Sequence, residues 1–547
     1  MSVIAAPPVA HGAIAAPART LPALLRRFLL PSFADWFFVA LLVWIFMAGS
    51  GGWSALLADG DIGWHIRAGQ YILNTHTVPH ADLFSFSLAG QPWFAWEWLA
   101  DVIFALLYGA AGLKGVVLFA GVLIAAFGAM LVRYMVWRGA NGLIAVIVCL
   151  VAVGAASVHF LARPHLVTLV FLVATLWLLD ADRQRPSRAV WLLVALTALW
   201  TNLHGGFAIV FMVLGLYALG ALAEGREGWP RAGRYGVLFS ACAGATLVNP
   251  YGWGLHRHLV EYLRSDWIRN VVQEFQAPTF RSENQLQFEI LLLAGILAAG
   301  ACLRRMSLTQ PLLVVGFAHL ALTSARHIPL FAVVAAPLIA GEGTRLWAGL
   351  VERSRPRSVV RILEAVTAGA SANFRRWSLF PPLVILVIAA VPGITFWPPD
   401  FPQQMFPVGM ISANTQLIVG SRVLTTDQWA DYLLFRFWPS TKVFVDGRTD
   451  FYGSRVGGEY LDLWHGQGRW RALLDRYGFQ TALIPPDWAL CALLRQDPAW
   501  REIRADKQAV LFVKATGGPA GGSEGASPAG ASDRIGAGVL RNRNSRP

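Results

Sequence analysis

Two carboxylates and an imidazole stand close together directly after the first long apolar run of the chain. The segment reads D-G-D-I-G-W-H from Asp59 to His65. On a helix that starts near Asp61, side chains three and four positions apart share a face, so Asp61, Trp64 and His65 align. A carboxylate beside a histidine can take a proton from a hydroxyl group, as a general base does. We therefore predict Asp61 as the catalytic base, with Asp59 as the second choice and His65 as a catalytic neighbour.

A second pair of acids lies further along the stretch that follows the first apolar run. Glu97 and Asp101 are four residues apart in a Trp-rich stretch, which is typical of a membrane–water interface. Residues 58–113 are therefore predicted to form an outer loop with two acidic, aromatic helices that lie along the membrane surface. A plainer interpretation is an interfacial loop with Trp anchors and solvated charges. Asp59, Asp61 and His65 could also hold a divalent metal, but no sequence spacing requires one, and no metal is assigned.

Basic and polar residues mark the outer ends of later apolar runs. The four motifs are H-F-L-A-R-P-H (159–165), T-N-L-H-G-G (201–206), V-N-P-Y-G (248–252) and S-A-R-H-I-P (324–329). Ionisable groups at membrane depth are costly and usually face a cavity or a partner, so we predict that these ends converge with the first loop on one polar pocket. A single Arg or His at a helix end is otherwise a snorkelling anchor or a cap. The predicted substrate-binding residues are Trp64, Glu97, Asp101, Arg163, His165, His204, Asn249, Tyr251, Arg326 and His327.

The composition indicates a membrane protein with many spans. Of the 547 residues, 56% are hydrophobic and 14% are charged, whereas soluble domains are about 25% charged. The net charge of +13 comes from short basic clusters between apolar runs, which are an orientation signal. Nucleic acid is therefore excluded as a partner. The four cysteines stand apart and offer neither a disulfide framework nor a thiolate metal site.

Eleven apolar runs are predicted as transmembrane helices. The first, 36–57, is long enough to cross a hydrocarbon core of about 30 Å at about 1.5 Å per residue. Arg and Lys recur at every second junction, which puts residues 1–35 in the cytoplasm and the C-terminal third outside. The transmembrane domain covers 36–396 and includes an outer loop at 250–287, in which residues 253–287 are a predicted lid over the pocket. The further runs are 115–135, 141–160, 165–180, 189–203, 206–223, 235–249, 288–303, 309–324, 328–348 and 378–396.

Residues 397–514 have the character of a small α/β domain outside the membrane. Short apolar runs alternate with amphipathic ones, which favours a mainly parallel sheet. The predicted strands are 422–425, 442–445, 481–484 and 509–513, and the predicted helices are 428–437 and 469–477.

One charged segment of this domain is a further candidate for ligand binding. Asp446, Arg448 and Asp450 follow a predicted strand, where α/β domains keep their ligand groups. The alternative is a charged turn held by its own Arg–Asp pairs. Beyond the domain, residues 515–547 are rich in Gly, Ala and Ser and are predicted to be disordered.

With these residues assembled, the chain resembles the GT-C class of membrane glycosyltransferases, which includes protein O-mannosyltransferases and aminoarabinose transferases. The resemblance rests on the acidic loop after the first span, on arginines at later outer helix ends and on the soluble C-terminal domain. The runs D-G-D-I-G-W-H-I-R-A-G, E-W-L-A-D and V-F-V-D-G-R-T-D-F-Y are similar to those of a large group of bacterial proteins assigned to this class.

The resemblance implies an all-α polytopic fold with about eleven transmembrane helices and a small extracytoplasmic α/β domain, in the cytoplasmic (inner) membrane of a bacterium. It implies an inverting glycosyltransferase that takes a sugar from a polyprenyl-phosphate donor in the outer leaflet and transfers it to an acceptor hydroxyl. Asp61 or Asp59 matches the first-loop general base of the class, while Arg163 and Arg326 are candidates for holding the donor phosphate. The acceptor, a glycan, a lipid or a protein, stays open.

Two other classes compete with this interpretation. A lipid or sugar transporter, or flippase, would use the same Arg and His residues for substrate passage, but would show internal repeats or ionisable residues near mid-span. The sequence shows His319 as the one ionisable residue well inside a run. A non-catalytic scaffold of the cell envelope would have a first-loop acid that points away from the arginines.

Overall fold

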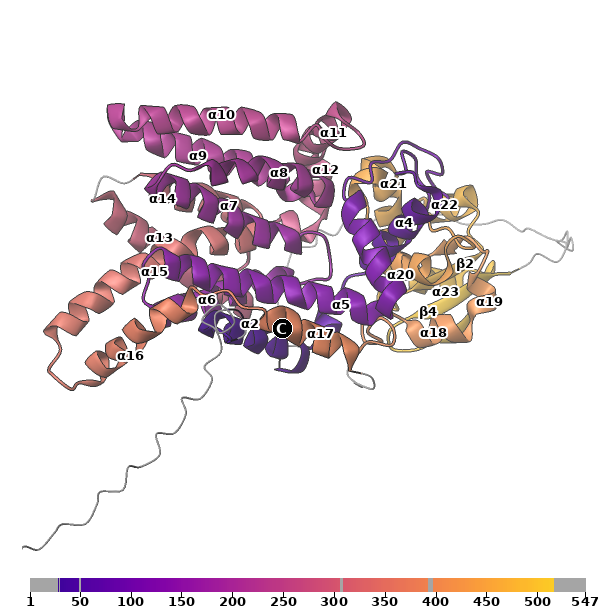
Figure 1. The fold of residues 1–547 in the computed structure, drawn as a ribbon. Coiled ribbons are helices and arrows are strands. Elements are labelled where there is room, and N and C mark those ends of the chain that lie inside the picture. The colour runs from indigo at the N-terminus through magenta and orange to yellow at the C-terminus, as the bar shows by residue number, and fades with distance from the viewer. Residues whose placement is uncertain (1–27, 29, 49–50, 305–307, 392–396, 516–547) are drawn as a thin grey trace, which may run out of the picture.

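The structure is a computed structural model that describes residues 28, 30–48, 51–304, 308–391 and 397–515. Figure 1 shows a bundle of long helices that run side by side, with a smaller mixed α/β part packed against one end of the bundle. Nearly all of the predicted disordered tail, and most of the predicted cytoplasmic N-terminal segment, lie outside the described residues.

Each of the eleven predicted runs contains a helix. Five helical segments among the described residues are long and apolar enough to cross a membrane: Trp98–Trp137, Gly142–His159, Gly205–Ala223, Asn284–Leu303 and Ala325–Arg353. The chain is thus a multi-span membrane protein, whereas the number of eleven spans stays a prediction. The helices of the bundle are α2 (Phe33–Val43), α5 (Trp98–Trp137), α6 (Gly142–Ala156), α7 (Leu166–Gln184), α8 (Leu192–Leu203), α9 (Ile209–Ala223), α10 (Trp229–Ala245), α13 (Glu283–Leu303), α14 (Thr309–Thr323), α15 (Ile328–Arg353), α16 (Val359–Phe374) and α17 (Phe380–Ala390).

Helix α5 lies at the centre of the bundle and contacts α2, α6, α7 and α15. Gly112 has a φ of 61° and breaks α5 into two helices, which agrees with a separate helix before the second run. Further along, Gly128 leaves room for Leu41 of α2, and Gly121 leaves room for Phe46 of the π-helical turn η1 (Trp44–Ala48) that follows α2, because a Cβ at either glycine would lie closer than 3.0 Å to these side chains. Small residues therefore let these two apolar helices approach closely.

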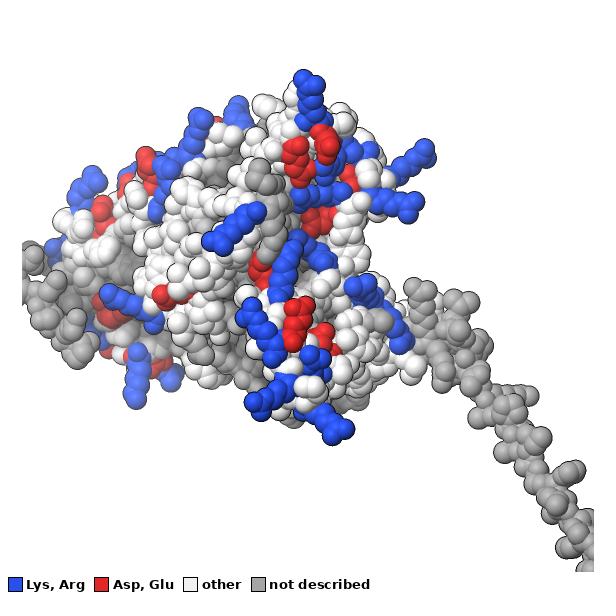
Figure 2. Space-filling view, turned by 90° about the vertical axis from the view of Figure 1, so that its left-hand side faces the viewer, with Lys and Arg blue, Asp and Glu red and all other residues white. Residues whose placement is uncertain are grey.

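The basic junctions gather at the end of the bundle opposite the α/β part. Figure 2 views the molecule from that end and shows many Lys and Arg side chains on it. The chain reaches this end after α5, α7, α9 and α15, with Arg138, Arg183, Arg226 and Arg353 at or near the turns. The predicted inner junctions therefore share one end of the molecule, and the side of the membrane stays a prediction.

The first outer loop contains α3 (Trp53–Leu56) and α4 (Ile62–Thr75). Helix α4 packs against the start of α5, where a Cβ on Gly69 would lie closer than 3.0 Å to the Asp101 carbonyl oxygen. Asp61 precedes α4 and its side chain makes no capping hydrogen bond. The carboxylate of Asp61 is therefore available to other partners.

The α/β part contains a four-stranded sheet in the order β1-β2-β4-β3. Its strands are β1 (Val423–Leu424), β2 (Thr481–Ile484), β3 (Trp500–Ala505) and β4 (Val510–Lys514). Strands β1 and β2 are parallel, but β4 is antiparallel to both β2 and β3. The predicted mainly parallel sheet is therefore wrong. A tight turn at Asp506, whose carboxylate accepts hydrogen bonds from the amides of Gln508 and Ala509, joins β3 to β4 as a hairpin.

The helices of this part differ from the prediction mainly by additions. Helices α20 (Asp427–Phe437) and α22 (Trp470–Tyr477) confirm the two predicted ones. The predicted strand at 442–445 is wrong, because Val443 forms only isolated bridges, to Ser85 of the first loop and to Val423. The remaining helices are α18 (Val408–Ala413), α19 (Thr415–Ile418), α21 (Thr449–Trp464) and α23 (Ala489–Gln496), with α11 (Trp253–Arg264) and α12 (Asp266–Val271) in the later outer loop.

Two glycines of the D-G-D-I-G run let the C-terminal part dock on the first loop. A Cβ at Gly60 or Gly63 would lie closer than 3.0 Å to backbone oxygens of α20, those of Gln428 and Asp431. The amide of Gly60 donates to Oε1 of Gln428 at 2.7 Å, and Arg67 of α4 donates to the Phe435 carbonyl oxygen. The acidic loop and the C-terminal part thus form one continuous surface.

Candidate active site

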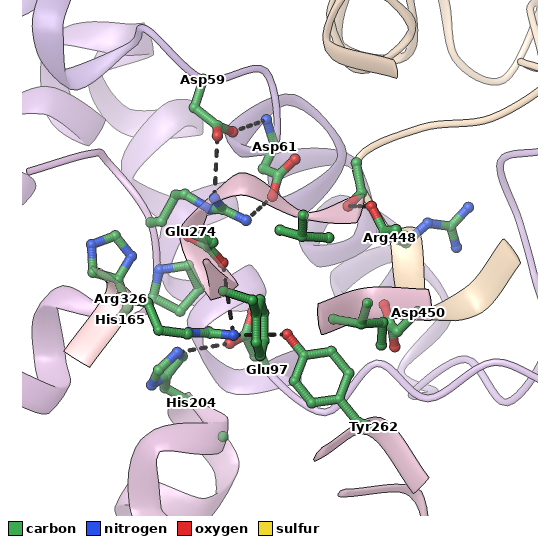
Figure 3. Close-up of a pocket in the computed structure, with 18 of the residues that line it drawn as sticks. Asp59, Asp61, Glu97, His165, His204, Tyr262, Glu274, Arg326, Arg448 and Asp450 are labelled. Atoms are coloured by element: carbon green, nitrogen blue, oxygen red, sulfur yellow. Dashed lines mark hydrogen bonds and ion pairs between the residues drawn. The ribbon is translucent and has the colours of Figure 1, made fainter. Parts of the chain in front are cut away.

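A cavity of about 900 Å³ lies where the bundle, the first loop and the C-terminal part meet. Figure 3 shows acids and basic groups from all three pointing into it. Its apolar wall comes from the ends of α7, α9, α14 and α15 that face the C-terminal part. The segment 253–287 lines it through α11, α12 and residues 271–275, in the place predicted for a lid.

Arg163 pairs with both acids at the start of the first loop. Its Nη1 lies 3.2 Å from Oδ2 of Asp59, and its Nη2 is hydrogen-bonded to Oδ2 of Asp61. Oδ1 of Asp59 also accepts the amide of Asp61 at 2.8 Å. The turn between α6 and α7 carries Arg163, and this turn is tied to the first loop where the amide of Ala162 donates to the Leu56 carbonyl oxygen at 2.8 Å.

Burial changes the chemistry of Asp61. Its side chain is 3% exposed. Loss of solvation raises the pKa of Asp61 to about 8, although the charge of Arg163 opposes the rise. A carboxylate whose pKa lies near neutral pH is a stronger base than an exposed one, which suits proton transfer.

Arg326 is the second cation of the cavity. Its Nη1 donates to the hydroxyl oxygen of Tyr262 at 2.9 Å and lies 3.7 Å from Oε1 of Glu274, and its guanidinium stacks 4.4 Å from the centre of the Phe275 ring. Burial alone would raise the pKa of Glu274, but a hydrogen bond from His159 at 3.0 Å and the charge of Arg326 hold it well below its usual value. The Arg326 guanidinium therefore has an ionised partner.

Glu97 lies between two histidines. Its carboxylate oxygens are 3.5 Å from Nε2 of His204 and 3.7 Å from Nε2 of His65. Burial raises the pKa of Glu97 to about 7, while burial and the charges of Arg326 and Arg163 lower that of His204 to about 3. His204 is therefore neutral, and its Nδ1 accepts the Gly206 amide at 3.0 Å, so the proton is on Nε2, facing Glu97.

The structure brings most of the predicted site residues together. Four do not line the cavity. The ring of His65 is buried and its Nδ1 lies 2.6 Å from Oδ1 of Asp101, because this face of α4 packs on α5. The predicted residues that line the cavity are Asp59, Asp61, Trp64, Glu97, Arg163, His165, His204, Arg326 and His327.

Asn249 and Tyr251 stabilise the local structure and do not line the cavity. The side chain of Asn249 holds its own turn by accepting the Tyr251 amide at 2.8 Å. The Tyr251 hydroxyl donates to the Pro79 carbonyl oxygen and accepts the Ala95 amide, both at 2.7 Å, so it ties this turn to the first loop. The prediction that these residues and His65 share the pocket is therefore wrong.

The charged turn of the C-terminal part is held by its own pairs, as the plainer alternative predicted. Arg448 is buried, contacts Asp446 at 2.6 Å and Asp82 of the first loop at 2.7 Å, and lies over the rings of Phe84 and Trp93. Asp446, Arg448 and Asp450 all line the cavity. Oδ2 of Asp450 also lies 3.2 Å from Nε2 of His258.

Several cavity residues were not predicted. Glu274 and Tyr262 come from the later outer loop, and Asp427 comes from the start of α20. For Asp427 the sequence gives one signal, because it directly follows Thr426, a residue type that caps helices. The Thr426 side chain does accept the Trp429 amide at 3.0 Å. This signal identifies a helix start and carries no information about what that helix end faces.

The described part of the chain holds no group of three or more His, Cys, Asp or Glu side chains that could bind a metal. The set considered from the sequence is not assembled. The Arg163 guanidinium bridges Asp59 and Asp61, and His65 faces Asp101 instead.

Comparison with known proteins concerns the fold. No model of a known protein family matches the sequence, and no curated protein matches it. The Archaeoglobus fulgidus oligosaccharyltransferase tethered to an acceptor peptide matches with a TM-score of 0.52 and 10% identity, over 82% of this chain and 68% of that chain. The oligosaccharyltransferase AglB of that organism, in complex with an inhibitory peptide and a dolichol-phosphate, matches with a TM-score of 0.50 and 12% identity, over 84% and 70%. The chain therefore shares the fold of these oligosaccharyltransferase structures.

A third neighbour is ArnT from Cupriavidus metallidurans, with a TM-score of 0.40 and 13% identity, over 87% of this chain and 96% of that chain. At such low sequence identity, the similarity to the archaeal structures shows the fold alone. What the cavity does must be argued from its own residues.

Proposed function

We propose that this protein is a membrane glycosyltransferase that moves a sugar from a polyprenyl-phosphate donor to an acceptor hydroxyl at the outer face of the cytoplasmic membrane. The observation that carries the proposal is the single cavity in which Asp61, Arg163 and Arg326 meet the apolar ends of bundle helices. It combines a base, two cations and a surface for a lipid chain.

The donor side of the cavity faces the bundle. Leu169 of α7, Met212 of α9, Leu320 of α14 and Leu330 of α15 line it, so a polyprenyl chain lying among these helices would bring its phosphate to the basic residues. A guanidinium offers five N–H donors in a planar fork that suits phosphate oxygens. In Arg326 the contacts to Tyr262 and Glu274 both use Nη1.

The proposed transfer step is a direct displacement at the anomeric carbon of the donor sugar. The acceptor hydroxyl oxygen attacks the anomeric carbon, its proton passes to Asp61, and the bond from that carbon to the phosphate oxygen breaks with its electron pair on the phosphate. Arg163 serves both partners, because its charge favours the ionised form of Asp61 and its guanidinium has further N–H donors for the leaving phosphate. One direct displacement inverts the configuration at the anomeric carbon.

The acceptor side is formed by the C-terminal part. Asp427, Asp450, Tyr460 and Trp464 line this wall, and carboxylates with aromatic rings suit an acceptor that carries hydroxyl groups, whether glycan, lipid or protein. The scaffold alternative required a first-loop acid directed away from the arginines, whereas Asp61 is paired with Arg163. We find no described feature that favours a transporter.

The test is donor turnover by the purified protein in lipid nanodiscs, with a panel of radiolabelled polyprenyl-phosphate sugars and membrane extract as the acceptor source. The wild type should release polyprenyl phosphate, and Asp61→Asn should lower the rate by about 10² to 10⁴. Asp475→Asn is the matched control, since Asp475 is exposed and its ion pair with Lys514 lies at the surface. A wild type that consumes no donor of the panel would contradict the proposal.

A further inference from the structure

A second buried acid lies behind Asp61. Asp431 is in the second turn of α20 and is fully buried, at 0% exposure. Both of its carboxylate oxygens accept the Gly447 amide, each at 3.2 Å. Asp431 does not line the cavity, so it touches no substrate there.

The two acids face each other across Gly447. Oδ1 of Asp61 and Oδ2 of Asp431 both lie closer than 3.0 Å to the point where a Cβ of residue 447 would stand. Oδ1 of Asp61 is buried and has no hydrogen-bond partner among the described residues, since Oδ2 is the atom that meets Arg163. A glycine at 447 is what allows the first loop and the C-terminal part to bring these oxygens together.

Two buried carboxylates this close do not both ionise, because each charge is poorly solvated and repels the other. One proton therefore belongs to the pair. Arg163 stabilises the charge on Asp61, whereas burial and the charge of Asp61 raise the pKa of Asp431 well above its usual value. The proton is on Asp431. The charged and titratable groups around the pair are Asp59, Arg163, Asp427 and Asp446. Arg448 pairs with Asp446, and the Tyr460 hydroxyl donates a hydrogen bond to Asp427.

We propose that Asp431 is a positioning residue: it stays protonated, donates a hydrogen bond to Oδ1 of Asp61, and thereby orients Asp61 toward the cavity. Its role in catalysis rests on the proposed transferase function. No proton is consumed in this role, because Asp61 takes the acceptor proton while Asp431 keeps its own. The C-terminal part is then a component of the catalytic site and not only a wall for the acceptor.

Asparagine and alanine at 431 distinguish positioning from packing. Asp431→Asn keeps an N–H donor of nearly the same shape, so its turnover should stay near the wild-type rate. Asp431→Ala removes the donor and should lower kcat by about 10- to 100-fold, the effect of losing a residue that orients a metal ligand in other active sites. Wild-type activity should also fall at alkaline pH as Asp431 loses its proton, and Asp431→Asn should lack this fall. An unchanged pH profile in Asp431→Asn, or full activity in Asp431→Ala, would overturn the proposal.

A stability measurement tests the proposed Asp61–Asp431 pair without an activity assay. The folded pKa of the pair lies above the unfolded value, so its stabilising contribution is complete below the unfolded pKa and is lost as pH rises through the folded one. The melting temperature of the full chain in detergent, measured from about pH 6 to about pH 10, should therefore fall toward alkaline pH in the wild type and less in Asp431→Asn. If this difference appears in a protein without transferase activity, the acid pair stands and the proposed function fails. If both proteins have the same pH dependence, the acid pair is refuted.

Discussion

Arg448 offers the sharpest test of how the C-terminal part is attached. Its guanidinium is 2% exposed and neutralises Asp446 and Asp82, both at 0% side-chain exposure. Removing one partner of a buried ion pair costs about 3–5 kcal/mol, because the remaining charges stay buried without compensation. At about 2–4 °C per kcal/mol, the slope for domains of about 150–250 residues, Arg448→Ala should lower the melting temperature by about 6 to 20 °C.

The assay is thermal unfolding of the detergent-purified full chain at neutral pH, followed by tryptophan fluorescence, with donor turnover as a second readout. Arg495→Ala is the matched control, because Arg495 is 46% exposed and pairs with Glu502 at the surface, where such pairs contribute about 0–1 kcal/mol. Turnover should fall with stability, since Arg448 fixes the turn that carries Gly447. An Arg448→Ala protein that melts within about 2 °C of the wild type would refute the claim that this buried pair joins the first loop to the C-terminal part.

Three further predictions concern the docking of α20, the titration of Glu97 and the membrane topology. Gly63→Ala should weaken the docking of α20 on α4 and lower the melting temperature, because its Cβ would collide with the Asp431 carbonyl oxygen; Gly109→Ala, where a Cβ meets nothing within 4 Å, should not, and equal melting of the two would contradict the packing. Burial raises the pKa of Glu97 to about 7, so the wild type should lose stability as pH rises through about 7, and Glu97→Gln should lose less; identical pH–stability curves would show that Glu97 does not titrate there. A reporter enzyme fused after Lys514 should be active outside the cytoplasm, and activity only inside would reverse the predicted topology.

The sequence predicts much of this fold because helix and strand periods are local properties. The strand Thr481–Ile484 and the helix at Asp427–Phe437 follow from apolar patterns within a few residues. Val443 shows the limit. Its apolar neighbours resemble a strand, but its backbone partners are Phe84 and Phe86 in the first loop. Partners this far apart along the chain leave no local pattern.

The candidate site shows the same limit at the level of side chains. Asp61 and Arg163 could be identified because charged groups near membrane spans are costly and need partners. The spacing of Asp61 and His65 predicts a shared helical face but not the neighbour of that face, which is Asp101. Asp431 gave no signal, since an acid in an amphipathic helix is usually solvated, and only the glycines at 63 and 447 let it reach the first loop.

The most direct test of the central claim is photo-crosslinking of a polyprenyl phosphate, with a photoreactive group near its phosphate end, to the protein in nanodiscs, followed by mass spectrometry. The account predicts crosslinks to the cavity-lining ends of α7, α9, α14 and α15, around Leu169, Met212 and Leu330, and weaker crosslinking in Arg326→Ala. Crosslinks confined to the outside of the bundle, such as α10 or α16, and unaffected by Arg326→Ala, would contradict a lipid-phosphate donor in this cavity.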